Sequence, residues 1–146
     1  MRLIAHRGNI HGPNKTRENE PKYIIEALDE YDCEIDIRYI NNEYYLGHDE
    51  PSYRIDIEFL LKYSNKLWIH CKNFEAFDNL IEIKELNIFW HQNDEYTLTS
   101  HGYIWAYPNM KTSAKCIILM PEWNNFTYDK GYGICSDYID KIKNIK

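Results

Sequence analysis

The chain lacks any long run of hydrophobic residues. The longest run, Cys116 to Met120, is far shorter than the roughly 20 apolar residues that a transmembrane helix needs, so we expect no membrane span. The opening residues, Met1 to Ile4, also lack the apolar stretch of a secretory signal peptide. Together these absences predict a cytoplasmic protein.

Cysteine is scarce, and basic residues are outnumbered by acidic ones. Cys33, Cys71 and Cys116 lie inside apolar runs, unlike the regularly spaced loop cysteines of a small secreted disulfide scaffold. We therefore expect four free thiols in a reducing compartment. With 17 Lys and Arg against 23 Asp and Glu, the net charge of -6 disfavours nonspecific binding to polyanions, because such binding needs clustered cations. Nucleic acid is not an expected partner.

Linkers, internal repeats and low-complexity tracts are also absent, so the chain predicts a single domain over residues 1–146. Short segments of β-branched, aromatic and aliphatic residues predict eight strands. The four clearer strands are Arg2–His6, Cys33–Ile40, Leu67–Lys72 and Asn87–His91. The four weaker strands are Tyr96–Ser100, Tyr103–Tyr107, Lys115–Met120 and Gly133–Ser136.

Helical spacing is clear only in the first half of the chain. Pro21 suits the first turn of a helix whose apolar residues are Tyr23, Ile24, Ala27, Leu28 and Tyr31. A second helix is predicted over Asp56–Tyr63. A third opens with Asn73 as its N-cap and carries the apolar residues Phe77, Leu80, Ile81 and Leu86.

Alternation of strands and helices predicts an α/β fold with a parallel sheet. Eight parallel strands are typical of a TIM barrel, but that fold usually takes about 250 residues. A chain of 146 residues leaves no room for helices after most of the later strands. We therefore expect a compact or incomplete TIM barrel with several helices reduced or missing.

Polar side chains alternate with apolar ones inside two predicted strands. Because residues i and i+2 point to the same face of a sheet, Glu34, Asp36 and Arg38 share one face of the second strand. His70 and Lys72 alternate in the same way in the third. A buried carboxylate must be paired or must bind a cation, so Glu34 and Asp36 are candidate ligands for a divalent metal. The alternative is an edge strand of an antiparallel sheet, with these residues on a solvated polar face.

Two histidines lie where predicted strands end in turns. His6 and Arg7 close the first strand and precede Gly8, where the backbone can turn and a ligand can approach. Strand ends are where α/β proteins place catalytic groups, although a surface His-Arg pair is the alternative. His48 follows a short excursion after the second strand, which would return it to the same rim. The other histidines considered are expected in loops or in the core: His11, His91 and His101.

Five segments of the first half follow one another in a suggestive order. They are Ile4-Ala5-His6-Arg7-Gly8, Glu18-Asn19-Glu20-Pro21, Cys33-Glu34-Ile35-Asp36-Ile37-Arg38, Leu46-Gly47-His48-Asp49 and Ile69-His70-Cys71-Lys72. In order and spacing the chain resembles the glycerophosphodiester phosphodiesterase family. The second half matches it more loosely, through Trp105-Ala106-Tyr107-Pro108-Asn109 and Gly133-Ile134-Cys135-Ser136-Asp137.

The resemblance implies a TIM-barrel enzyme that hydrolyses glycerophosphodiesters or similar small phosphodiesters to a phosphomonoester and an alcohol. It also implies one divalent metal, usually calcium or magnesium. Carried over by position, the implied roles are acid/base catalysis for His6 and His48, metal binding for Glu34 and Asp36, and phosphate binding for Arg7 and Lys72. Phosphoryl transfer does need a base, an acid and cations on the developing charge, so these residue types suit the reaction.

The chain departs from the family pattern at His70. The family has a glutamate there as a third metal ligand, so His70 is the corresponding ligand in this chain. Imidazole suits Mn, Fe, Ni or Zn better than Ca or Mg, which leaves Mn or Zn open as the metal.

Three further expectations follow from the same pattern. A shortened relative could bind phosphate or a phosphodiester through Arg7 and Lys72 without catalysis, and His70 favours that alternative. A lyase that releases a cyclic phosphate would use the same two histidines. A barrel that lacks helices would expose apolar strand faces, so we also expect a homodimer or a larger homo-oligomer.

Overall fold

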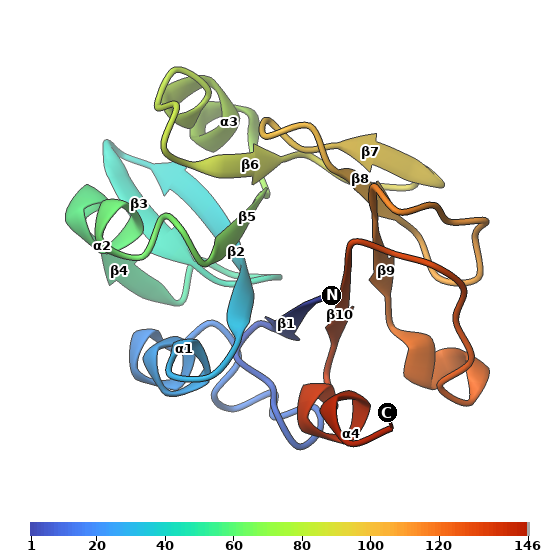
Figure 1. Cartoon of the computed structure of the whole chain (residues 1–146). Coiled ribbons are helices and arrows are strands. Elements are labelled where there is room, and N and C mark those ends of the chain that lie inside the picture. Colours follow the sequence, from blue (N-terminus) through green and yellow to red (C-terminus); the bar gives the residue numbers. More distant parts are fainter. Residues whose placement is uncertain (146) are drawn as a thin grey trace.

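The computed structural model describes residues 1–145 and has an α/β fold built on one curled sheet (Figure 1). Its strands are Arg2–His6 (β1), Asp32–Ile40 (β2), Glu43–Leu46 (β3), Tyr53–Ile55 (β4), Leu67–Cys71 (β5), Asn87–Phe89 (β6), Tyr96–Leu98 (β7), Ile104–Ala106 (β8), Cys116–Leu119 (β9) and Gly133–Ser136 (β10). Its helices are Pro21–Leu28 (α1), Ile57–Lys62 (α2), Phe74–Leu80 (α3), the 3-10 helix Pro121–Asn124 (η1) and Ile139–Lys143 (α4). All eight predicted strands are therefore present, most of them slightly shortened.

Seven of the strands run parallel to their neighbours, in the spatial order β6-β5-β2-β1-β10-β9-β8. The expectation of a parallel sheet is confirmed for these strands. It is wrong for β7, which pairs antiparallel with β8 because only a short turn separates the two strands. The segment after β2, which was expected to be a simple excursion, forms the antiparallel strands β3 and β4.

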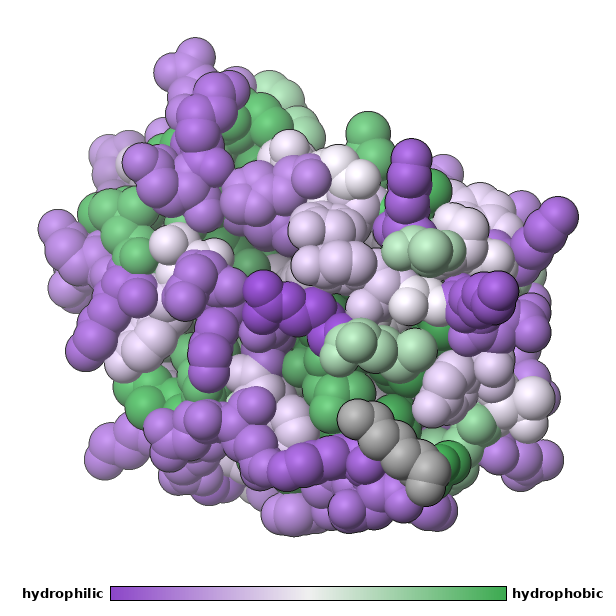
Figure 2. Space-filling view, in the orientation of Figure 1, coloured by the Kyte–Doolittle hydropathy of each residue, from purple (hydrophilic) through white to green (hydrophobic). Residues whose placement is uncertain are grey.

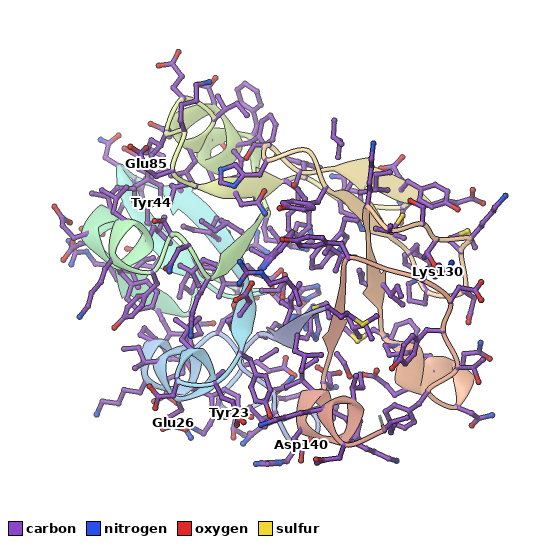
Figure 3. All side chains as sticks on the ribbon, viewed as in Figure 1. Tyr23, Glu26, Tyr44, Glu85, Lys130 and Asp140 are labelled. Carbon is purple, nitrogen blue, oxygen red and sulfur yellow. The ribbon has the colours of Figure 1, made fainter. Side chains whose placement is uncertain are left out.

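The sheet curls until its two edges come close together between β6 and β7 (Figure 1). In the described part of the chain no strand ladder joins these two strands. Hydrogen bonds that involve the residues just after each strand link the two edges instead: Ser100 N donates to Ile88 O at 2.8 Å, Ile88 N donates to Ser100 Oγ at 2.9 Å, and Thr97 Oγ1 donates to Trp90 O at 2.8 Å. The curled sheet therefore surrounds an interior, and side chains fill that interior (Figure 3).

Two of the helices, α1 and α3, begin at the signals expected from the sequence. Pro21 occupies the first turn of α1, and the Asn73 side chain caps α3 by accepting a hydrogen bond from Ala76 N at 3.1 Å. The predicted extent of the third helix is wrong. The helix ends at Leu80, because the N–H groups of Ile83 and Leu86 bond to carbonyls three residues back and so form turns.

Two apolar clusters hold the sheet. The larger one packs the helices against the outer face of the sheet and includes Ile35 and Ile37, which are fully buried. The smaller one fills the interior and consists of Ile4, Trp68, Phe89, Trp105, Ile117 and Cys135. Because side chains alternate along each strand, the inward residues nearest the carboxyl ends lie above this inner cluster. That layer contains the candidate site.

Helices cover only part of the sheet. In Figure 1, α1, α2 and α3 lie outside the half built from β1 to β6, whereas the stretch from β7 to β9 has no α-helix over it. Leu98 on β7 is 67% exposed as a result. On the face drawn in Figure 2, hydrophobic residues form separate patches among hydrophilic ones. Among the described residues no helix has the length and apolar character needed to cross a bilayer, and the four cysteines are buried and unpaired.

Candidate active site

The predicted site residues meet at the carboxyl ends of the parallel strands. A cavity of about 570 Å³ opens there, and six of the seven predicted residues line it: His6, Arg7, Glu34, His48, His70 and Lys72. The seventh, Asp36, is fully buried, and it lies 3.0 Å from Arg7 and 3.2 Å from His70. The structure therefore brings together residues that span more than 60 positions in the sequence.

The two carboxylates of β2 lie inside the protein. Glu34 is 2% exposed and Asp36 is 0% exposed. Strand β2 pairs with β1 and β5 on its two sides, so it is a central strand of a parallel sheet. The alternative of a solvated polar face on an antiparallel edge strand is wrong, because both carboxylates are buried on a central strand. Two buried acids must be compensated by neighbouring groups or by a cation.

Asp36 receives part of that compensation from the protein. Its Oδ2 accepts a hydrogen bond from Asn19 Nδ2 at 2.9 Å, and its backbone N donates to Asn19 Oδ1 at 2.9 Å. Arg7 Nε lies 3.0 Å from the same Oδ2. Burial alone would raise the pKa of Asp36, but the nearby His70 imidazole and the Arg7 charge outweigh burial and lower this pKa. Asp36 is therefore held as a carboxylate.

Glu34 is compensated less completely. Burial raises the pKa of Glu34 and the charge of Asp36 raises it further, against the opposing effects of His6, Arg7 and His70. Its nearest basic atoms are His70 Nδ1 at 3.7 Å and His6 Nε2 at 3.8 Å, both beyond ordinary hydrogen-bond distance. The second carboxylate therefore has room for a further partner.

His70 is fixed so that one ring nitrogen faces both carboxylates. Its Nε2 donates to the backbone carbonyl of His91 at 2.9 Å, and its ring stacks on Phe89 with centroids 5.0 Å apart and an interplanar angle of 9°. Because a carbonyl oxygen can only accept, Nε2 carries a proton. Nδ1 points to Asp36 Oδ1 at 3.2 Å and to Glu34 Oε1 at 3.7 Å. Either Nδ1 carries a second proton, or it shares a cation with the two carboxylates.

These three residues fit a divalent cation. Each offers one ligand atom, and these atoms all lie within 4.8 Å of one another. Glu34 Oε2 and Asp36 Oδ1 are buried and have no hydrogen-bond partner in the described part of the chain. Buried acceptors of this kind are normally satisfied, so their presence here is consistent with an ion as the further partner. The three ligands predicted from the sequence therefore form a candidate metal centre.

His6 is held by a carboxylate from the far end of the chain. Its Nδ1 lies 2.7 Å from Asp137 Oδ1, and because a carboxylate accepts, Nδ1 is the donor. The other ring nitrogen, Nε2, faces Glu34. Burial alone would lower the pKa of His6, but the hydrogen bond to Asp137 and the charge of Glu34 outweigh burial and raise it.

His48 has a similar contact in a more open position. Its Nδ1 lies 2.8 Å from Asp49 Oδ1, so the nitrogen free for other contacts is again Nε2. The side chain is 37% exposed, and burial together with the charges of Arg7 and Lys72 lowers its pKa despite the opposing charge of Asp36. The site thus presents two imidazoles, each held through Nδ1 by a carboxylate.

The two predicted phosphate-binding cations differ in their surroundings. The Arg7 guanidinium is partly engaged, with Nε 3.0 Å from Asp36 Oδ2 and Nη1 3.3 Å from Glu18 Oε2. Lys72 lines the cavity and makes no salt bridge within the described residues. A lysine of this kind can meet an incoming anion without breaking an existing ion pair.

Four polar residues without a predicted role also build this site: Asn9, Glu18, Asn19 and Asp137. Asn9 is fully buried, and its amide donates to Glu18 Oε1 at 3.0 Å and to Asp137 Oδ1 at 2.8 Å. Asn9 therefore links Glu18, which contacts Arg7, to Asp137, which contacts His6. The position of Asp137 directly after a predicted strand was an available signal. The Asn9 loop offered none.

The histidines left out of the site have ordinary surroundings. His11 is 79% exposed beside Asp140, and His101 donates to the carbonyl of Lys84. His91 is at the cavity wall, with Nε2 bonded to the Asp94 carbonyl.

No protein-family model, curated protein or solved structure matches the chain.

Proposed function

We propose that this chain is a metal-dependent phosphodiesterase with a shortened TIM barrel of the glycerophosphodiester phosphodiesterase type. It would hydrolyse glycerophosphodiesters or similar small phosphodiesters to a phosphomonoester and an alcohol. One observation carries the proposal. Two imidazoles, His6 and His48, each held through Nδ1, lie beside the two buried carboxylates of β2, each of which has one oxygen without a hydrogen-bond partner among the described residues. A site that only bound anions would gain nothing from those carboxylates.

In the proposed reaction, one histidine accepts a proton from water as the water oxygen forms a new bond to phosphorus. The bond from phosphorus to the ester oxygen breaks, and the other histidine gives its proton to that leaving oxygen. Asp137 and Asp49 hold the two rings so that Nε2 is available to carry the proton in each case. The structure supports this assignment because neither Nε2 is engaged in a hydrogen bond among the described residues.

Cations would balance the charge that develops on the phosphoryl oxygens. Glu34, Asp36 and His70 would hold a divalent ion, which when bound would supply Lewis-acid stabilisation. Lys72 would contact a phosphate oxygen directly, and the free edge of Arg7 would add a second positive charge. Because one ligand is an imidazole, we expect Mn or Zn to support turnover at least as well as Mg or Ca.

The contact of His70 with Asp36 favours a second candidate function. A proton on His70 Nδ1 could compensate Asp36 at 3.2 Å in place of a metal ion. The chain would then bind a phosphodiester through Lys72 and Arg7 without turning it over. Metal dependence separates this candidate from the first.

The test is hydrolysis by protein stripped of metal with a chelator and then supplied separately with Mg, Ca, Mn or Zn. Bis(p-nitrophenyl) phosphate and glycerophosphocholine serve as substrates, and His6→Ala and His48→Ala as variants. We expect metal-restored turnover that falls about 100-fold or more in either variant. Phosphorus NMR of the products distinguishes a phosphomonoester from the cyclic phosphate of a lyase.

His11→Ala is the matched control, because His11 also lies 2.7 Å from an aspartate but is exposed and outside the cavity. Its turnover should equal that of the wild type. If folded wild-type protein is inactive with every metal and still binds phosphodiesters, the non-catalytic function is correct.

A further inference from the structure

The walls of the cavity differ in chemical character. One side, built from β1, β2, β5 and the loop after β3, carries the charged and imidazole groups of the site. The other side, built from the last residue of β9 and the segments that follow β6, β8 and β9, is mainly aromatic and apolar: His91, Tyr107, Pro108, Leu119, Met120 and Trp123. Gln92 also lies on this second side and carries an amide group. A ligand that fills the cavity therefore needs a polar part and an apolar part.

Two aromatic side chains on the apolar side are open to solvent. Trp123 is 63% exposed and Tyr107 is 45% exposed, and both line the cavity. His91 offers little hydrogen bonding there, since its Nε2 is bonded to the Asp94 carbonyl at 2.7 Å and its ring stacks on Tyr107 with centroids 5.9 Å apart. Large exposed aromatic surfaces beside a cavity are typical of ligand contacts.

The segment that carries Trp123 is held firmly in place. Met120, Asn125 and Phe126 all have positive φ values, of 44°, 51° and 59°, which are unfavourable for residues other than glycine. Glu122 ties the segment to the end of β10, because its carboxylate accepts hydrogen bonds from the Ser136 hydroxyl at 2.8 Å and the Asp137 N–H at 2.9 Å. The same contact links the Trp123 segment to the aspartate that holds His6.

We infer that the substrate carries an apolar, preferably aromatic, ester group that packs against Trp123 and Tyr107 while its phosphate lies at the charged side. The inference rests on the proposed function, and it narrows the substrate class. A polyol such as glycerol would lose water on the apolar side and gain few hydrogen bonds there. A flat or hydrocarbon group would bury the exposed aromatic surface instead.

The test compares methyl p-nitrophenyl phosphate with phenyl p-nitrophenyl phosphate in the presence of the best metal. Both substrates release p-nitrophenolate and differ only in the other ester group, and their uncatalysed hydrolysis rates correct for the higher intrinsic reactivity of the phenyl diester. We expect kcat/KM to be about 10-fold or more higher for the phenyl diester, and Trp123→Ala to bring the ratio of the two kcat/KM values close to one. Phe74→Ala is the matched control, because Phe74 is 64% exposed but does not line the cavity.

A binding measurement tests the same inference without turnover. The indole N–H signal of Trp123 is assigned in a nitrogen–proton NMR spectrum by its absence from Trp123→Phe, and metal-free protein is then titrated with the monomethyl ester of phenylphosphonic acid. The monomethyl ester of methylphosphonic acid is the comparison compound. If the phenylphosphonate shifts the Trp123 signal and the methylphosphonate does not, the aromatic contact is supported, even if no metal gives turnover. Equal kcat/KM values for the two diesters in an active wild type, or an unmoved Trp123 signal, would overturn the inference.

Discussion

At the scale of single residues, Asp137 determines which nitrogen of His6 is available for chemistry. It binds His6 Nδ1 at 2.7 Å and is itself held by Asn9 Nδ2 at 2.8 Å. Partners of this kind fix the tautomer and the direction of a histidine ring. The acid/base role proposed for His6 therefore depends on a residue 131 positions away in the chain.

We predict that Asp137→Asn lowers kcat by about 100-fold or more, because the amide can rotate and impose the wrong His6 tautomer, while KM changes much less. Steady-state kinetics with bis(p-nitrophenyl) phosphate measures both values. Asp140→Asn is the control, since Asp140 makes the same 2.7 Å contact to the exposed His11. Equal loss in both variants would show that the effect on turnover is not specific to the site.

The lowered pKa of Asp137 also leads us to expect that the stability of the protein depends on pH. Burial alone would raise its pKa, but the hydrogen bond from His6 and the other contacts outweigh burial and lower it. A carboxyl whose folded pKa lies below its unfolded value of about 3.9 stabilises the protein above that value, and the contribution is lost as the pH falls through the folded pKa. The free energy lost in Asp137→Asn, about 2 kcal/mol at pH 7, should therefore shrink below about pH 4. Urea unfolding at pH 7, 5 and 3 measures the change, and a constant difference would contradict it.

At the scale of elements, the loop after β3 places His48 at the cavity, and Gly47 makes the loop possible. Gly47 has φ of +149°, and a Cβ added there would lie 1.9 Å from the Glu50 carbonyl oxygen. Its N–H donates to the Asp36 carbonyl at 3.1 Å, so the loop is fastened to β2. Strand β3 thus returns the chain along β2 to the candidate metal centre.

We predict that Gly47→Ala destabilises the protein by more than 2 kcal/mol or displaces the loop, because the new methyl group would collide with backbone and not with a flexible side chain. Turnover by the Gly47→Ala variant should also fall, because the loop carries His48. Gly102→Ala is the comparison, since Gly102 has a positive φ of +82° but nothing within 4 Å of the added Cβ, so its cost should be about 1 kcal/mol. Thermal unfolding of the two variants tests the difference, and equal melting temperatures would contradict it.

At the scale of the whole molecule, the uneven covering of the sheet is the main feature. The outer face of β7 to β9 has no α-helix over it, and a groove of about 500 Å³ there is lined by apolar residues such as Leu98 and Ile104 together with polar ones such as Thr97 and Lys111. Tyr96 beside them is 41% exposed. The sheet keeps its curl without these helices because the inner cluster and the parallel ladders hold it.

The homodimer expected from the sequence stays a prediction, and this exposed apolar face supplies its physical reason. Size-exclusion chromatography with light scattering should give twice the monomer mass or more at micromolar concentration. A mass equal to that of one chain over the whole concentration range would contradict it.

The sequence by itself determined eight of the ten strands of the curled sheet and the inward face of β2 and β5. Alternation of polar and apolar residues is a local property, and the parallel sheet preserves it, so Glu34 and Asp36 could be grouped before the fold was known. His70 was added to them only by the resemblance of the sequence pattern to a family. Asn73 and Pro21 marked helix starts for equally local reasons. The end of α3 was missed, because turns replace the helix after Leu80.

Only the tertiary structure decided which distant groups complete the site. Asn9 and Glu18 lie in a loop without a periodic pattern, and Asp137 meets His6 because β10 pairs with β1 across the whole length of the chain. The antiparallel direction of β7 and the position of Trp123 at the cavity wall likewise depend on how far the sheet curls. Curl and register are properties of many strands together, and no short segment of sequence encodes them.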